Sequence, residues 1–134
     1  MKSLVFDSTI WIDALNKKNT EKVELLRNIA PNENSVILFP VIAQEVLQGI
    51  KSDEQFKKVY QNLNGFTVFS LPPWETHIGA AILYRDLRKK GITIRKPNDC
   101  IIAFLAIHFK LELVHNDSDF DLIAHNSPLK IYKP

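Results

Sequence analysis

Four acidic residues stand at places where carboxylates can act together as metal ligands. Asp7 follows the apolar run Leu4–Phe6, which has no polar alternation and is typical of a strand buried on both faces of a parallel sheet. Asp117 comes just after the predicted strand at 111–115. Glu45 lies within an otherwise apolar helical stretch, and Asp99 opens the most hydrophobic predicted helix.

Each of these acids also has a simpler interpretation. Asp7, Asp99 and Asp117 can cap helices, and Glu45 can belong to a solvent-facing stripe. Because the strands of a parallel sheet end at one edge, however, the acids are expected to converge there and to repel one another. Cations relieve such repulsion. We therefore predict a cation site at that edge of the sheet, where ligands of open α/β sheets usually bind.

The ligand atoms indicate which cation is expected. Carboxylate oxygens select hard ions, Mg²⁺ or Mn²⁺, whereas zinc prefers nitrogen and sulfur. The four histidines show no metal-ligand spacing, which also argues against zinc. Mg²⁺ indicates phosphate chemistry, in which the metal activates a water and stabilises charge on the phosphate. The sequence has no Gly-rich phosphate loop, so binding of a nucleoside triphosphate is not expected.

The elements that must position these acids alternate between strand and helix. Apolar runs predict strands at 4–6, 36–39, 66–70, 111–115 and 129–132, and helical periodicity predicts helices between them, including 74–90 and 99–109 with Asn98 as its cap. This alternation predicts a single α/β domain over 1–134, a three-layer α/β/α sandwich with a mainly parallel central sheet.

Composition narrows the class of protein further. The net charge is only +2, but without the four acids 11 acidic residues remain against 17 Lys and Arg, which suits a polyanion bound around an acidic pocket. No apolar run approaches the ~18 residues of a membrane span, and the N-terminus does not read as a signal peptide. The one cysteine, Cys100, fits a packed thiol in a reducing compartment. A cytoplasmic protein without membrane association is expected.

The same residues carry a resemblance to a known family. The opening Val5–Asp13, the stretch Val41–Gly49 around Glu45, the segment Asn98–Ala103 and the segment Asp117–Phe120 occur in the order and spacing of PIN domains. The chain is most similar to the small ribonuclease toxins of VapBC-type toxin-antitoxin pairs. No single motif is specific, but the joint pattern covers essentially the whole chain.

The resemblance implies a ligand set and partners. Asp7, Glu45, Asp99 and Asp117 would hold one or two Mg²⁺ or Mn²⁺ ions, with Thr9 supporting Asp7. The last acid of the family falls at either Asp117 or Asp119, and Asp117 is favoured because it is nearer the strand. The family often has a threonine at the position of His115. An RNA substrate, a homodimer and a cognate antitoxin are also implied.

The expected activity is metal-dependent endoribonuclease cleavage by water attack on an RNA phosphodiester bond. Arg95 and Lys96, just before Asp99, are candidate RNA phosphate contacts, although a solvated loop is the simpler interpretation. Trp11 can stack on a base, but its flanking isoleucines favour core packing.

Three other classes of function fit the sequence less well than this one. The main alternative is a catalytically inactive PIN-like domain that binds RNA or a partner, which the retention of four mutually repelling carboxylates disfavours. A phosphoacceptor signalling domain needs an aspartate after the third strand, where the chain has Ser70 to Pro72. A phosphatase with an aspartate nucleophile needs a second aspartate two residues after Asp7, where the chain has Thr9.

Overall fold

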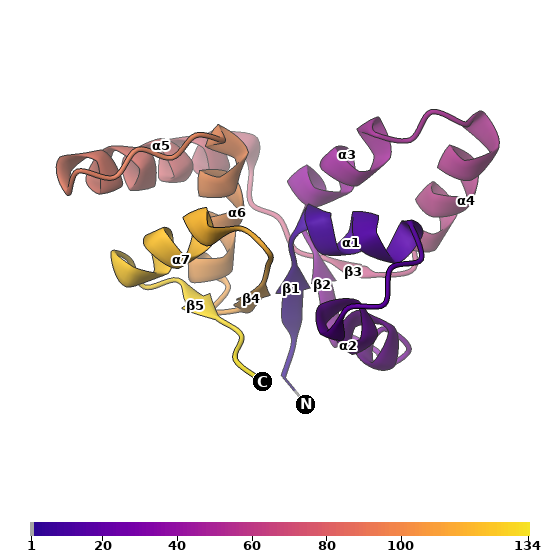
Figure 1. Cartoon of the computed structure of the whole chain (residues 1–134). Helices are drawn as coiled ribbons and strands as arrows, with labels where there is room; N and C mark the ends of the chain where they lie inside the picture. The colour runs from indigo at the N-terminus through magenta and orange to yellow at the C-terminus, as the bar shows by residue number, and fades with distance from the viewer. Residues whose placement is uncertain (1) are drawn as a thin grey trace.

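A five-stranded sheet forms the centre of the computed structural model, which describes residues 2–134 (Figure 1). The strand order is β3-β2-β1-β4-β5, and every neighbouring pair is parallel. The sequence-based prediction of a mainly parallel sheet is therefore confirmed. The strands are β1 (Leu4–Phe6), β2 (Val36–Leu38), β3 (Thr67–Val68), β4 (Glu112–Val114) and β5 (Lys130–Ile131).

Seven helices cover the two faces of this sheet among the described residues. Helices α1 to α4 lie on one side and α5 to α7 on the other, which confirms the three-layer α/β/α architecture (Figure 1). They are α1 (Ser8–Leu15), α2 (Glu21–Ile29), α3 (Pro40–Gln48), α4 (Asp53–Leu63), α5 (Pro73–Lys89), α6 (Pro97–His108) and α7 (Ser118–His125).

Local sequence signals explain most of the helix starts. The Thr20 side chain accepts a hydrogen bond from the Val23 amide at the start of α2, and Ser52 accepts one from the Gln55 amide at the start of α4. The predicted start of α6, at residue 99, was wrong by two residues, because the helix begins at Pro97. Asn98 does not cap this helix, because Pro97 already occupies its first turn, where a missing N–H costs nothing. Asp99 consequently lies inside the first turn of α6.

The core explains why α6 holds its place beside the sheet. Six α6 side chains are buried, including Asp99. Helix α5 packs closely on α6 at Gly79, where an added Cβ would lie 2.2 Å from the Phe104 ring. On the opposite face, Trp11 is buried and meets Phe66 edge-to-face at 5.1 Å between ring centroids, so its predicted core packing is confirmed.

Candidate active site

The site lies where the strand order of the sheet reverses. From β1 the chain crosses to β2 on one side, whereas β4 pairs with β1 on the other side. The Asp7 amide extends this pairing by donating a hydrogen bond to the Val114 carbonyl at 2.9 Å. The residues that follow β1 and β4 are therefore held next to each other, at the topological switch point where α/β proteins bind ligands.

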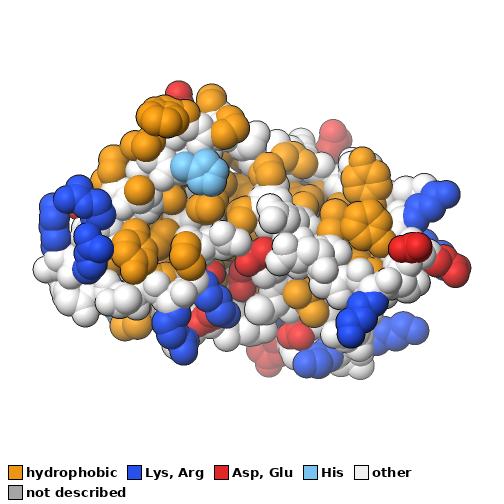
Figure 2. Space-filling view, turned by 90° about the horizontal axis from the view of Figure 1, so that it is seen from above, with side chains coloured by type: hydrophobic (Ala, Val, Ile, Leu, Met, Phe, Trp, Pro, Cys, Tyr) orange, Lys and Arg blue, Asp and Glu red, His pale blue; other side chains and the backbone are white. Residues whose placement is uncertain are grey.

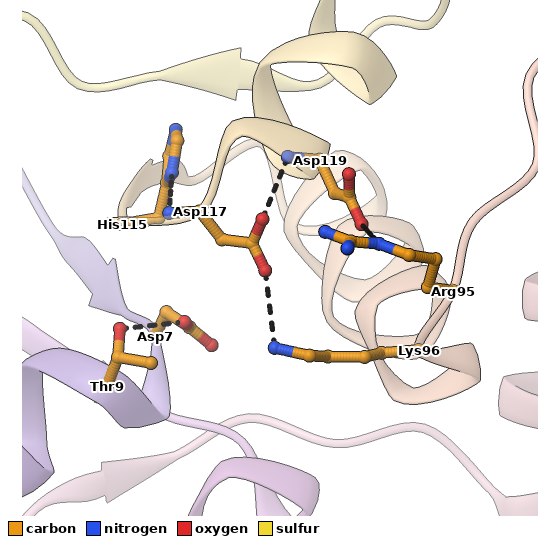
Figure 3. Close-up of polar contacts among 7 residues, drawn as sticks. All are labelled: Asp7, Thr9, Arg95, Lys96, His115, Asp117 and Asp119. Atoms are coloured by element: carbon orange, nitrogen blue, oxygen red, sulfur yellow. Dashed lines mark hydrogen bonds and ion pairs between the residues drawn. The ribbon is translucent and has the colours of Figure 1, made fainter.

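Asp7 is buried at this edge of the sheet. It occupies the N-cap position before α1, but its carboxylate makes no side-chain capping hydrogen bond of regular geometry to that helix. The Thr9 hydroxyl donates a hydrogen bond to Asp7 Oδ2 at 3.1 Å (Figure 3). Burial raises the pKa of the Asp7 carboxyl, and the amides of Ser8 and Thr9 oppose that rise.

Asp99 and Glu45 carry oxygens that have lost water without gaining a partner. Asp99 is 4% exposed, and both its Oδ2 and Glu45 Oε1 are buried with no hydrogen-bond partner in the described part of the chain. Burial, with the nearby Asp7 and Asp117 charges, raises the Asp99 pKa to about 7. Burial and Asp7 also raise the pKa of Glu45. These two groups fit the ligands of a cation, since buried carboxylate oxygens without a partner are costly.

Two further acids come from the start of α7. Asp117 Oδ1 accepts from the Asp119 amide at 2.9 Å, so the predicted capping role of Asp117 is real. That hydrogen bond, with the nearby Lys96, lowers the pKa of the Asp117 carboxyl. One ligand atom from each of Asp99, Asp117 and Asp119 lies within 4.8 Å of the others. Asp7 and Glu45 fall outside this closest group but act on Asp99 through their charges.

Two cations from the loop before α6 face these acids. Lys96 Nζ lies 3.4 Å from Asp117 Oδ2, and Arg95 Nε lies 3.5 Å from Asp119 Oδ2 (Figure 3). Asp117 raises the pKa of Lys96, with smaller contributions from Asp99 and Asp7. From above the site, acidic side chains gather near the middle of the face with Lys and Arg beside them (Figure 2).

The sequence did not predict that these two cations would pair with the acids, nor what His115 contacts. His115 is buried and bonds the Asp117 amide and the Asp121 carboxylate. Asn98, predicted as a cap, instead lies beside Glu45, where its side chain opposes the rise of the Glu45 pKa. The spacing of Asp117 and Asp119 at a helix start was the available signal that both acids face one site. No comparable signal identified His115 or Asn98.

Comparison with known proteins agrees with this geometry. The family model described as the PIN domain matches residues 4–126, which contain every acid of the site. The chain belongs to the PIN domain family. This PIN domain is 30% identical over 128 residues to VapC ribonuclease Mb1587 of Mycobacterium bovis, and equally to ribonuclease VapC11 of Mycobacterium tuberculosis. In both cases the match covers 95% of this chain and 96% of the relative.

Solved structures share the fold of this PIN domain. VapBC2 from Rickettsia felis, bound to a promoter DNA fragment, superposes with a TM-score of 0.75 at 23% identity and covers 96% of each chain. A toxin-antitoxin complex from Klebsiella pneumoniae gives a TM-score of 0.68 at 25% identity, over 96% of this chain and all of the other.

Within the described residues, no helix is both long and apolar enough to span a membrane.

Proposed function

We propose that this PIN domain is a metal-dependent endoribonuclease that hydrolyses RNA phosphodiester bonds in the cytoplasm. The observation that carries the proposal is the gathering of five carboxylates at one edge, with two buried oxygens, Glu45 Oε1 and Asp99 Oδ2, that lack partners. Catalytically idle acids at such a position would destabilise the fold without compensation. The relatives at 30% identity are named as ribonucleases, which supports RNA as the substrate.

The carboxylate ligands favour Mg²⁺ or Mn²⁺ as the cofactor. We assign Asp99, Asp117 and Asp119 as the closest ligand group, with Asp7 and Glu45 completing the site. A divalent ion bound there would lower the pKa of a water and stabilise charge on the scissile phosphate. Thr9 fixes the orientation of Asp7 through its hydroxyl, and the Asp119 amide fixes that of Asp117.

Arg95 and Lys96 are proposed as phosphate contacts. Their side chains are 74% and 61% exposed, so they are free to turn from the acids toward a bound strand. Without metal they offset the charge of Asp119 and Asp117. A cation bound among the acids would take over that role and would leave both side chains available to RNA phosphates.

Replacing Lys96 tests this exchange. We expect Lys96→Met to tighten Mn²⁺ binding, because a competing ammonium is removed. We also expect it to weaken RNA binding and to reduce the slope of log K for RNA against log salt concentration by about 0.7. RNA binding is measured by fluorescence anisotropy with Ca²⁺ filling the acidic site in place of Mn²⁺ and with the RNA shown to stay intact, and Mn²⁺ binding is measured by calorimetry. The matched control is Lys58→Met, since Lys58 lies 3.4 Å from Glu54 on α4. Equal effects of both substitutions would contradict the proposed contact.

The biological role that we propose is the toxin of a toxin-antitoxin pair, acting as a homodimer and silenced by a cognate antitoxin. Its support is the similarity to VapC ribonucleases and to structures of VapBC and toxin-antitoxin complexes. Induced expression in a bacterial host that lacks the antitoxin is expected to arrest growth, whereas Asp99→Asn at the same protein level is expected not to. Unimpaired growth despite accumulation of folded wild-type protein would contradict the toxin role.

A further inference from the structure

We propose that His115 is a positioning residue, whose ring holds the turn between β4 and α7 so that Asp117 and Asp119 face the metal site. The inference rests on the proposed function, because it gives these two acids their role as ligands. The imidazole ring of His115 has two nitrogens, so this one side chain can bridge two polar groups.

The hydrogen bonds of His115 determine the orientation of its ring. Nδ1 accepts from the Asp117 amide at 3.0 Å, so the proton of the neutral ring is on Nε2. Nε2 then donates to Asp121 Oδ1 at 3.1 Å. The ring is 6% exposed and packs on Phe120 at 5.3 Å between centroids. Its two polar contacts therefore tie the end of β4 to the first turn of α7.

A second contact holds the same turn from the outside. Lys22, on α2, donates to the His115 carbonyl and to Asn116 Oδ1, the latter at 3.1 Å. The backbone before α7 is thus held by α2 on one side and by the His115 ring on the other. Asp117 Oδ1 is occupied by the Asp119 amide, which leaves Oδ2 directed toward the site. The position of the Asp117 backbone consequently determines where both acids point.

The choice of variants separates positioning from simple core packing. His115→Leu keeps an apolar side chain in the buried position but removes both hydrogen bonds. His115→Asn places an amide oxygen where Nδ1 accepts from Asp117, so it can restore that bond. Lys22→Met removes the outer contact. Its matched control is Lys90→Met, since Lys90 donates to the Asn126 carbonyl at the far end of α7 at 2.8 Å.

Mn²⁺ affinity by titration calorimetry is the deciding measurement, with melting temperature recorded for each metal-free variant. Groups that orient metal ligands typically contribute 10–100-fold, so His115→Leu is expected to weaken Mn²⁺ binding by about tenfold or more, and His115→Asn to recover most of that loss. Lys22→Met is expected to weaken binding, and Lys90→Met to leave it unchanged. A variant that only lost core packing would have a lower melting temperature but would not show these differences in Mn²⁺ affinity.

The possible outcomes distinguish a failure of the positioning role of His115 from a failure of the proposed metal site. If folded His115→Leu binds Mn²⁺ as tightly as the wild type, the positioning role is wrong while the metal site stands. If His115→Leu does not fold, the comparison of Lys22→Met with Lys90→Met decides, and equal affinities overturn the inference. If the wild type itself binds no Mn²⁺, the proposed function fails first.

Discussion

Asp99→Asn is expected to abolish RNA cleavage while the protein stays folded. Asparagine has nearly the same volume as aspartate but lacks its charge. Asp99 belongs to the closest ligand group, and the charges of Asp7 and Glu45 also act on it. Removing one essential group of a catalytic unit typically costs a thousandfold or more, so we expect a loss of about that size in the initial cleavage rate.

The control for this substitution is Asp86→Asn, which makes the same chemical change on the exposed face of α5. Its cleavage rate is expected to equal that of the wild type. Circular dichroism establishes that both variants are folded before the rates are compared. A folded Asp99→Asn protein with the wild-type rate would exclude Asp99 from the reaction.

The second large effect concerns stability without metal. The Asp99 pKa is raised from 3.8 to about 7 by burial and by the neighbouring acids, so the folded state binds this proton more tightly than the unfolded state. The resulting stabilisation is complete below about pH 4 and is lost as the pH rises toward 7. Glu45 and Asp7, whose pKa values are also raised, act in the same direction.

Melting curves of the metal-free protein between pH 4 and 8 measure this effect. The melting temperature of Asp99→Asn relative to the wild type is expected to rise with pH and to level off above 7, and Asp86→Asn is expected to show no such trend. Near pH 7.5, Mn²⁺ at about 100 times its Kd is expected to raise the wild-type melting temperature by about 10 °C, because only the folded state binds it. A melting temperature indifferent to Mn²⁺ would contradict a preformed acidic site.

That two of the acids lie at the same edge of the sheet could be predicted, because each follows an apolar strand. Asp7 and Asp117 follow apolar strands, and parallel strands place such residues at one edge. The choice between Asp117 and Asp119 could not be made from spacing alone. The structure brings ligand atoms of both close to Asp99, because the first turn of α7 carries one acid as its cap and the other just inside the helix.

The remaining contacts depend on packing between segments that are distant in the sequence. Arg95 and Lys96 meet Asp119 and Asp117 across more than 20 residues, so they look like an ordinary basic loop in the sequence. Lys22 reaches the His115 carbonyl across 93 residues. Such pairs follow from how α2, α6 and α7 pack around the sheet edge, and no local pattern encodes that arrangement.

Incubation of the purified, partner-free protein with a pool of transfer, ribosomal and messenger RNAs tests the central claim most directly. Parallel reactions contain Mn²⁺, Mg²⁺ or EDTA, and Asp99→Asn is included in each. We expect discrete cleavage products with Mn²⁺ or Mg²⁺, none with EDTA, and none from Asp99→Asn under any condition. Cleavage that persists in EDTA, or an intact RNA pool when the protein has demonstrably bound Mn²⁺, would contradict the assignment of this site as a metal-dependent ribonuclease centre.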